Sequence, residues 1–133
     1  MSTTPAAKRR RRLFLLPWHI VLAAAFLVTF LTGQDASLGR VHLYAGCVVL
    51  GTLAVRLAAG LAGGGLALPF LRRGHPVLAT LAWLVILGVP AAAISGWHAV
   101  TSAAGADLHA ELSDLAAGLV TVHAAAVLAV FAG

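Results

Sequence analysis

The sequence predicts an all-α membrane protein, a bundle of four transmembrane helices with both chain ends in the cytoplasm. Three observations lead to this fold class. Of the 133 residues, 61% are hydrophobic and only 10% are charged. The apolar residues gather in four long stretches, and a basic cluster directly precedes the first of them. A soluble domain of this length has no core large enough to bury so much apolar surface.

The first apolar stretch, Leu13–Gly33, is expected to be a transmembrane helix. It follows the polar residues 1–12, which we expect to form a disordered basic cytoplasmic segment ending in Lys8–Arg12. A secretory signal is the alternative, but its apolar region spans 7–15 residues, and this run is about 20 residues long. The run also contains Trp18 and His19 and lacks a small-x-small cleavage site. Residues 13–133 are therefore expected to form one four-helix domain.

Three further stretches are long enough to cross about 30 Å of hydrocarbon. They are Val41–Ala62, Pro76–Trp97 and Leu108–Ala132. The expected connections are Gln34–Arg40, the glycine-rich Gly63–His75 and His98–Asp107. Proline is well suited to the first turn of a helix, which agrees with Pro76. Asp107 is expected to cap the fourth helix.

The basic residues predict the orientation of the bundle. The N-terminal cluster Lys8–Arg12, with Arg72 and Arg73 of the second connection, accounts for seven of the nine Lys and Arg residues. The first and third connections hold only Arg40. The positive-inside rule therefore places both termini in the cytoplasm. A nucleic-acid partner is disfavoured, since no basic patch is interleaved with aromatic residues.

The fourth stretch carries two histidines, His109 and His123, fourteen residues apart. On an α-helix this interval returns to within about 40° of the starting direction and spans about 21 Å along the axis. The acidic residues Glu111 and Asp114 fall on a different face. Apolar and mostly small residues lie on the stripe between the two histidines: Leu112, Ala116 and Val120.

Membrane topology gives each histidine a depth. His42 and His109 lie near the outer face, whereas His19 and His123 lie in the inner half of the bundle. Two stacked haems in a four-helix bundle, each with six-coordinate iron, require two pairs at matched depths. A single membrane histidine is often a hydrogen-bond partner between helices, which is the structural alternative for each residue alone.

Two further residues of the second helix are candidates for this site. Gly46 lies one turn from His42 and leaves space for the edge of a ring. Arg56 lies fourteen residues after His42, where its guanidinium is expected either to pair with a haem propionate or to snorkel to the inner surface. His75 and His98 are interpreted as interfacial, with His98 the first substitute for His42 or His109.

Other chemistries find little support. No nucleophile–base pair is apparent, and Gly63–Gly65 lacks the Lys-Ser/Thr of a phosphate-binding loop. Cys47 is alone, which excludes an intramolecular disulfide and, without C-x-x-C-H, covalent haem attachment. The histidines lack the i, i+4 spacing of a helical zinc site.

Residues 13–132 resemble the bacterial di-haem cytochrome b family, which includes the cytochrome b subunit of nickel–iron hydrogenases and stand-alone cytochrome b(561)-type proteins. The matching pieces are Trp18-His19, VHLYAGCVVLGTLAVRLAAGLAG from Val41, GHP at 74–76, Ile94-Ser95-Gly96 and LHAELSDLAAGLVTVH from Leu108. The resemblance implies that two non-covalent haem b groups are held by four axial ligands, paired as His42 with His109 and His19 with His123.

The resemblance also implies a function and a location in the bacterial inner membrane. We expect electron transfer from a periplasmic-side donor, a protein or a small reductant, to a quinone. From their charge and depth, Arg40 is expected either to steer small anions or to dock an acidic partner at the outer face, and Arg56, Arg72 and Arg73 to lie near the quinone at the inner face. The protein then serves as a subunit of a dehydrogenase or hydrogenase complex, or alone as a superoxide:quinone oxidoreductase. The alternative from a different class is a non-redox structural subunit, or a transporter with histidine proton relays.

Overall fold

The computed structural model describes the backbone of residues 5–62 and 76–132 and the side chains of residues 16–62 and 76–130. The elements, in chain order, are α1 (Pro5–Thr32), the short 3-10 helix η1 (Ala36–Leu38), α2 (Gly39–Leu61), α3 (Pro76–Ala99) and α4 (Ala103–Ala132). Within the described residues there is no strand. The predicted all-helical fold with four long helices is confirmed for this part of the chain.

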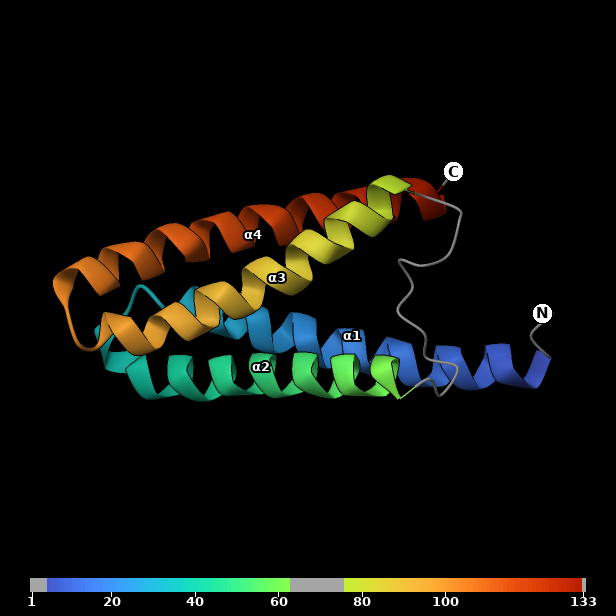
Figure 1. The fold of residues 1–133 in the computed structure, drawn as a ribbon, viewed down its shortest axis with the longest axis horizontal. Helices are drawn as coiled ribbons and strands as arrows, with labels where there is room; N and C mark the ends of the chain where they lie inside the picture. Colours follow the sequence, from blue (N-terminus) through green and yellow to red (C-terminus); the bar gives the residue numbers. More distant parts are fainter. Residues whose placement is uncertain (1–4, 63–75, 133) are drawn as a thin grey trace. The chain divides into compact units, whose positions relative to one another are not determined.

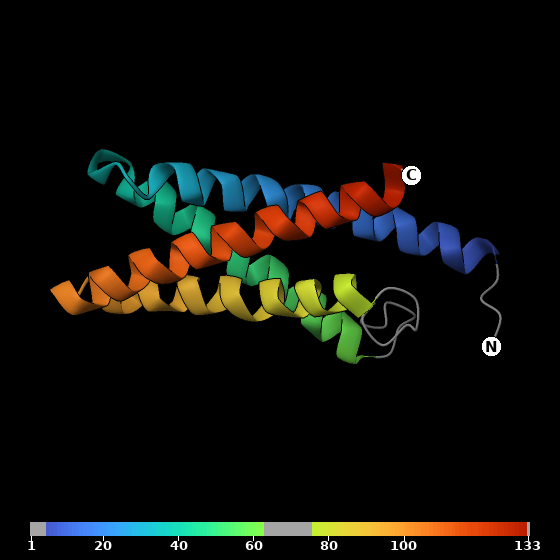
Figure 2. The same cartoon turned by 90° about the horizontal axis from the view of Figure 1, so that it is seen from above.

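The chain divides into two compact units, Met1–Leu68 and Pro69–Gly133. Each unit is a hairpin of two antiparallel helices, α1 with α2 in the first and α3 with α4 in the second (Figure 1). The view from above shows the same two pairs (Figure 2). Short connections make both hairpins tight, because only Gly33–Leu38 and Val100–Ser102 separate the paired helices.

Helix α1 is longer than expected. It begins at Pro5, so it includes residues 5–12, for which the sequence analysis expected disorder. Lysine, arginine and alanine all favour helix, and proline is accepted in the first turn of a helix, so this segment has no local reason to end the helix. The N-terminal turns of α1 extend past the end of α2 (Figure 1).

Helix α4 also begins earlier than predicted, at Ala103. The Ser102 hydroxyl accepts a hydrogen bond from the Gly105 amide at 3.0 Å, as an N-cap side chain does. The prediction that Asp107 caps this helix is therefore wrong, because Asp107 lies in its second turn. The serine cap and the alanines that follow it are sufficient to start the helix five residues sooner.

Gly105 lies where the α3–α4 turn is most crowded. A Cβ atom at residue 105 would lie 2.6 Å from the His98 carbonyl carbon and closer still to its oxygen. Gly105→Ala is expected to lower the thermal unfolding temperature of the detergent-solubilised protein, since backbone overpacking costs about 1–3 kcal/mol. The matched control is Gly118→Ala in the same helix, where an added Cβ meets nothing within 4 Å. A drop of equal size in both variants would contradict this explanation.

The first hairpin turn is stabilised by Asp35. Its carboxylate accepts hydrogen bonds from the Ser37 hydroxyl at 2.7 Å and the Ser37 amide at 2.8 Å, and so caps η1. Both hydrogen bonds lower the pKa of this exposed carboxyl below its ordinary value, and the bond from the Ser37 hydroxyl has the larger effect. Helix α2 then begins at Gly39, so Arg40 lies in its first turn and not in a loop.

Three helical segments are long and apolar enough to cross a membrane. They are Ala36–Leu61, Pro76–Ala99 and Ala103–Val130, and the described side chains of α1 form a shorter apolar segment, Leu16–Thr32. Few apolar side chains in the described residues are buried: Val49, Leu53, Val89, Ala92 and Ala116. Most large apolar side chains lie on the outside, a distribution that lipid tolerates and water does not.

Candidate functional site

His42 lies at the turn end of the first hairpin, in the first turn of α2. Its Nδ1 atom lies 2.8 Å from the carbonyl oxygen of Thr29, in the last turn of α1. Carbonyl groups in the last turn of a helix lack a partner within the helix, so this one is available to a side chain. Because a carbonyl oxygen only accepts, Nδ1 carries the hydrogen, and Nε2 is the nitrogen with the lone pair in the neutral ring.

Gly33 makes room for the His42 ring. A Cβ atom at residue 33 would lie 3.2 Å from Cε1 and 3.3 Å from Nδ1 of the imidazole. Both distances are below ordinary van der Waals contact, so any larger residue at this position would displace the ring or α1. The imidazole is therefore positioned by the Thr29 carbonyl of α1 and by the space that Gly33 leaves beside the ring.

His109 is held in a similar way in the second hairpin, in the second turn of α4. Its Nδ1 atom lies 2.9 Å from the Ala92 carbonyl oxygen and 3.0 Å from the Ser95 hydroxyl of α3. Ser95 is buried and donates its own hydrogen to the Ala92 carbonyl at 2.7 Å. The acceptors again place the hydrogen on Nδ1 and the lone pair on Nε2. A Cβ atom at Gly96 would lie 3.2 Å from Cε1 of this ring.

The fourteen-residue interval lies on one continuous helix, as predicted, because His109 and His123 both belong to α4. Ala116, halfway between them, is only 1% exposed, and both histidines are half-buried. Glu111 and Asp114 are exposed, which confirms that they lie on a different face. The Nδ1 atom of His123 is shielded from solvent. This stripe is the most buried face of α4.

Trp18, His19 and Arg56 lie in the part of the first hairpin that is remote from its turn. His19 stands edge-on to Trp18, with ring centroids 4.8 Å apart and an interplanar angle of 88°. The Arg56 guanidinium carbon lies 5.9 Å from the centre of the Trp18 ring, within the range of a cation–π contact. Arg56 is 4% exposed, although snorkelling would leave its charged end in solvent.

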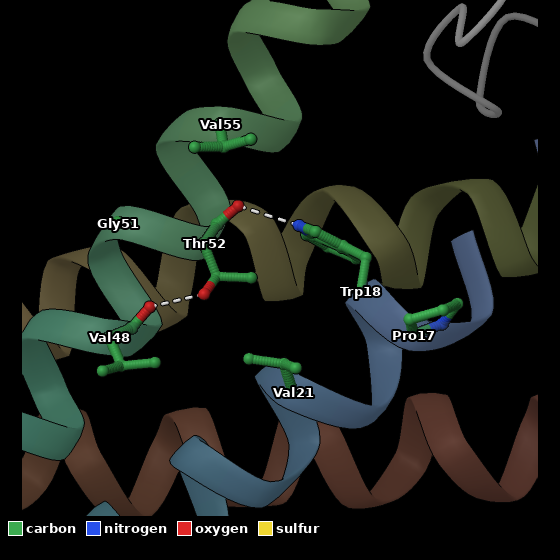
Figure 3. Close-up of a pocket in the computed structure, with 7 residues that line it drawn as sticks. All are labelled: Pro17, Trp18, Val21, Val48, Gly51, Thr52 and Val55. Atoms are coloured by element: carbon green, nitrogen blue, oxygen red, sulfur yellow. Dashed lines mark hydrogen bonds between the residues drawn. The ribbon is translucent and has the colours of Figure 1, made fainter. Parts of the chain in front are cut away.

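Trp18 also joins the two helices of this hairpin. Its indole N–H donates to the Thr52 carbonyl oxygen of α2 at 2.9 Å, and the Thr52 hydroxyl donates to Val48 O at 2.6 Å (Figure 3). An open apolar groove of about 560 Å³ lies beside this bond. Its lining residues are Pro17, Trp18, Val21, Val48, Gly51, Thr52 and Val55. Trp18 thus links α1 to α2 and contacts both His19 and Arg56.

Arg56 and His42 share a stripe of α2, in agreement with their fourteen-residue separation. Val49, Leu53 and Arg56 on this stripe are buried. Gly46, one turn from His42, is half-buried, and a Cβ atom there would meet only Thr29 Cγ2, at 4.0 Å. This is an ordinary contact, so packing within the hairpin does not require glycine at residue 46.

Each predicted ligand pair joins one residue from each hairpin, and the pairing of His42 with His109 and of His19 with His123 stays a prediction. His98 lies at the end of α3 and is exposed. Arg72, Arg73 and His75 lie outside the described residues. The sequence named Ser95 and Gly96 only as part of the family resemblance, and it gave no role to the other residues that contact the two rings, Thr29, Gly33 and Ala92. Their only signal in the sequence is that Thr32-Gly33 and Ser95-Gly96 recur at matching places.

Comparison of the chain with family models, with curated proteins and with solved structures finds no match. The described residues show a helical protein with helices that are long and apolar enough to cross a membrane, one of which carries His109 and His123 fourteen residues apart.

Proposed function

We propose that the chain is a transmembrane cytochrome b that moves single electrons through two haem b groups. His42 and His109 hold the outer haem, and His19 and His123 hold the inner one. Electrons enter from a periplasmic-side donor and leave to the quinone pool of the bacterial inner membrane. The observation that carries this proposal is the matched hydrogen bonding of His42 and His109, whose Nδ1–H groups both meet a backbone carbonyl.

These residues fit a haem iron because of the tautomer they adopt. Histidines that bind a metal nearly always donate their other ring N–H to a carboxylate, a carbonyl or water, which orients the ring and raises its basicity. A haem with two imidazole ligands supplies one-electron chemistry at iron and leaves no open position for oxygen. The Nδ1–H tautomer of His42 and His109, which leaves the Nε2 lone pair for a metal, supports this ligation.

Spacing within each hairpin supports ligand pairs that join the two hairpins. His109 and His123 are about 21 Å apart along α4. His42 contacts Thr29, ten residues after His19, so His19 and His42 lie at levels about 15 Å apart along α1. Neither separation suits two ligands of one iron. Each haem is therefore proposed to take one histidine from each hairpin, and the predicted membrane topology, which puts His42 and His109 near the outer face, favours pairing these two.

Orientation is part of the same proposal. The Pro5 end of α1 and the Leu61 end of α2 lie together at the end opposite η1 (Figure 1). Lys8–Arg12 belong to that end by sequence, so the positive-inside rule assigns it to the cytoplasm and the η1 turn to the periplasm. His42, beside that turn, is then an outer ligand, and the N-terminus is inside.

Arg56 is proposed to bind a propionate of the inner haem. Its guanidinium is buried against Trp18, which in turn contacts His19, and guanidinium groups bind carboxylates through two parallel hydrogen bonds. Arg56→Gln is expected to weaken retention of the inner haem about tenfold, and to leave the outer haem in place. Titration of haem loss by competing apomyoglobin measures this. Arg40→Gln, which changes an exposed arginine of the same helix, is the control, and equal loss in both variants would contradict the assignment.

Haem stoichiometry tests the proposed function. The full chain, purified from bacterial membranes in mild detergent, should carry about two b-type haems that dithionite reduces and ferricyanide oxidises. Low-spin signals in electron paramagnetic resonance should show two bis-histidine sites. A folded, purified chain that takes up no haem would overturn the proposal and favour the non-redox membrane protein.

A second measurement separates the two redox versions. Reduction of the haems by superoxide in proteoliposomes that contain quinone, with no other protein present, indicates the stand-alone oxidoreductase. Purification from native membranes together with a large redox subunit, without reduction by superoxide, indicates the subunit of a complex.

A further inference from the structure

The two hairpins hold their turn-end histidines by the same arrangement of three residues. In each, a carbonyl at position i accepts from the histidine, a hydroxyl at i+3 donates to that carbonyl, and a glycine at i+4 lies against the ring. We call this arrangement the helix clamp. Its residues are Thr29, Thr32 and Gly33 for His42, and Ala92, Ser95 and Gly96 for His109.

The two clamps agree in geometry as well as in residue type. The Nδ1-to-carbonyl distances are 2.8 Å for His42 and 2.9 Å for His109. The distance from an added glycine Cβ to the ring Cε1 atom is 3.2 Å in both. The hydroxyl-to-carbonyl distances are 3.3 Å for Thr32 and 2.7 Å for Ser95.

Helical geometry explains why this spacing holds a ring. Residues i and i+4 are neighbours one turn apart on a single face of a helix. The carbonyl at i therefore fixes which ring nitrogen carries the hydrogen, and the bare backbone at i+4 lets the ring edge approach. The hydrogen bond at Nδ1 and the close approach of the glycine at the neighbouring Cε1 act on the same edge of the imidazole and together restrict its orientation.

The two clamps differ at the hydroxyl. Ser95 Oγ lies 3.0 Å from His109 Nδ1 as well as 2.7 Å from the Ala92 carbonyl, and it is buried. Thr32 donates to the Val28 and Thr29 carbonyls, at 2.7 and 3.3 Å, on a half-buried surface. Loss of the Ser95 hydroxyl therefore removes a group that contacts the His109 ring directly. Loss of the Thr32 hydroxyl removes only a group that contacts the Thr29 carbonyl, which is the acceptor of the His42 hydrogen bond.

We propose that these helix clamps position both axial ligands of one haem, the outer haem. Ser95 and Gly96 act on His109, and Thr32 and Gly33 act on His42. The haem part of this inference rests on the proposed function, whereas the tautomer that the clamps impose does not. Substitutions in hairpins far apart in sequence should therefore disturb the same haem and leave the other unchanged.

The first test compares the two low-spin signals of the holoprotein by electron paramagnetic resonance. Gly33→Ala and Gly96→Ala are expected to shift or remove the same signal and to leave the second signal at its wild-type position. Ser95→Ala should shift that signal more than Thr32→Ala does. Ser95→Thr, which keeps a hydroxyl at this position, should leave the signal near its wild-type position. Gly51→Ala and Gly118→Ala, where an added Cβ meets nothing within 4 Å, are the matched controls. Effects of Gly33→Ala and Gly96→Ala on different signals would overturn the proposal.

The second test needs no haem. The full chain, labelled with ¹⁵N-histidine and made in haem-deficient cells, should show His42 and His109 as the Nδ1–H tautomer by nuclear magnetic resonance. His42→Ala and His109→Ala assign the two signals, and Gly96→Ala should alter that of His109 alone. An Nε2–H tautomer at either residue would overturn the clamp. If wild-type protein binds no haem yet both tautomers are as stated, the proposed function fails and the clamp stands as a device of the fold.

Discussion

Replacing His109 with alanine is expected to lower the haem content from about two to about one per chain, and His42→Ala to remove the same haem. Both residues hold Nδ1–H against a carbonyl at the turn end of their hairpins. In the proposed function, each supplies one of the two bonds to the iron of the outer haem. The haem that stays should keep its wild-type reduced spectrum. A pyridine haemochrome assay, compared with the protein concentration, gives the number of haems per chain. The variant that combines His42→Ala and His109→Ala should lose no more haem than either single variant.

His98→Ala is the control for this prediction, because His98 is exposed at the end of α3 and lies near the same turn as His109. It should keep both haems. If the His109→Ala protein retains both haems and the His98→Ala protein loses one, then His98 is the ligand in place of His109. If a His109→Ala protein that is still helical and monodisperse loses both haems, the prediction that the two haems bind independently is wrong.

Replacing His123 with alanine is expected to remove the other haem, and His19→Ala to remove that same one. His123 lies fourteen residues beyond His109 on the same buried stripe, so its loss leaves the outer ligands in place. The combined His19→Ala and His123→Ala variant should keep about one haem. The combined His109→Ala and His123→Ala variant, changed at two positions of one helix, should keep none.

These double variants also test the pairing by depth. The crossed pairing, His42 with His123 and His19 with His109, predicts that His19→Ala and His109→Ala together spare one haem. The pairing by depth predicts that this combination removes both. Spectra of reduced single variants add a check, since His19→Ala and His123→Ala should retain the same haem with the same absorption maximum.

Haem binding should also stabilise the fold if, as proposed, each haem takes one ligand from each hairpin. A group that binds only the folded state raises its stability in proportion to the logarithm of ligand concentration over Kd. The difference in unfolding temperature between the holoprotein and the haem-free chain should therefore be about halved in His109→Ala and in His123→Ala.

Much of the fold could be read from the chain directly. Helix type, the approximate spans and the shared face of His109 and His123 follow from apolar length and from a period of 3.6 residues, which are local properties. The ends were harder to place. Pro5 and Ala103 begin helices earlier than expected, because basic residues and alanines accept helical conformation and Ser102 supplies a cap.

The amino-acid pattern alone was sufficient to predict long apolar helices and a single helix face shared by His109 and His123. Only the tertiary structure decided what each imidazole touches: the Thr29 carbonyl for His42, and the Ala92 carbonyl with Ser95 for His109. It likewise decided that Arg56 lies against Trp18 and not at the surface. Such contacts depend on how one helix is rotated and shifted against its neighbour, and many side chains set that register together.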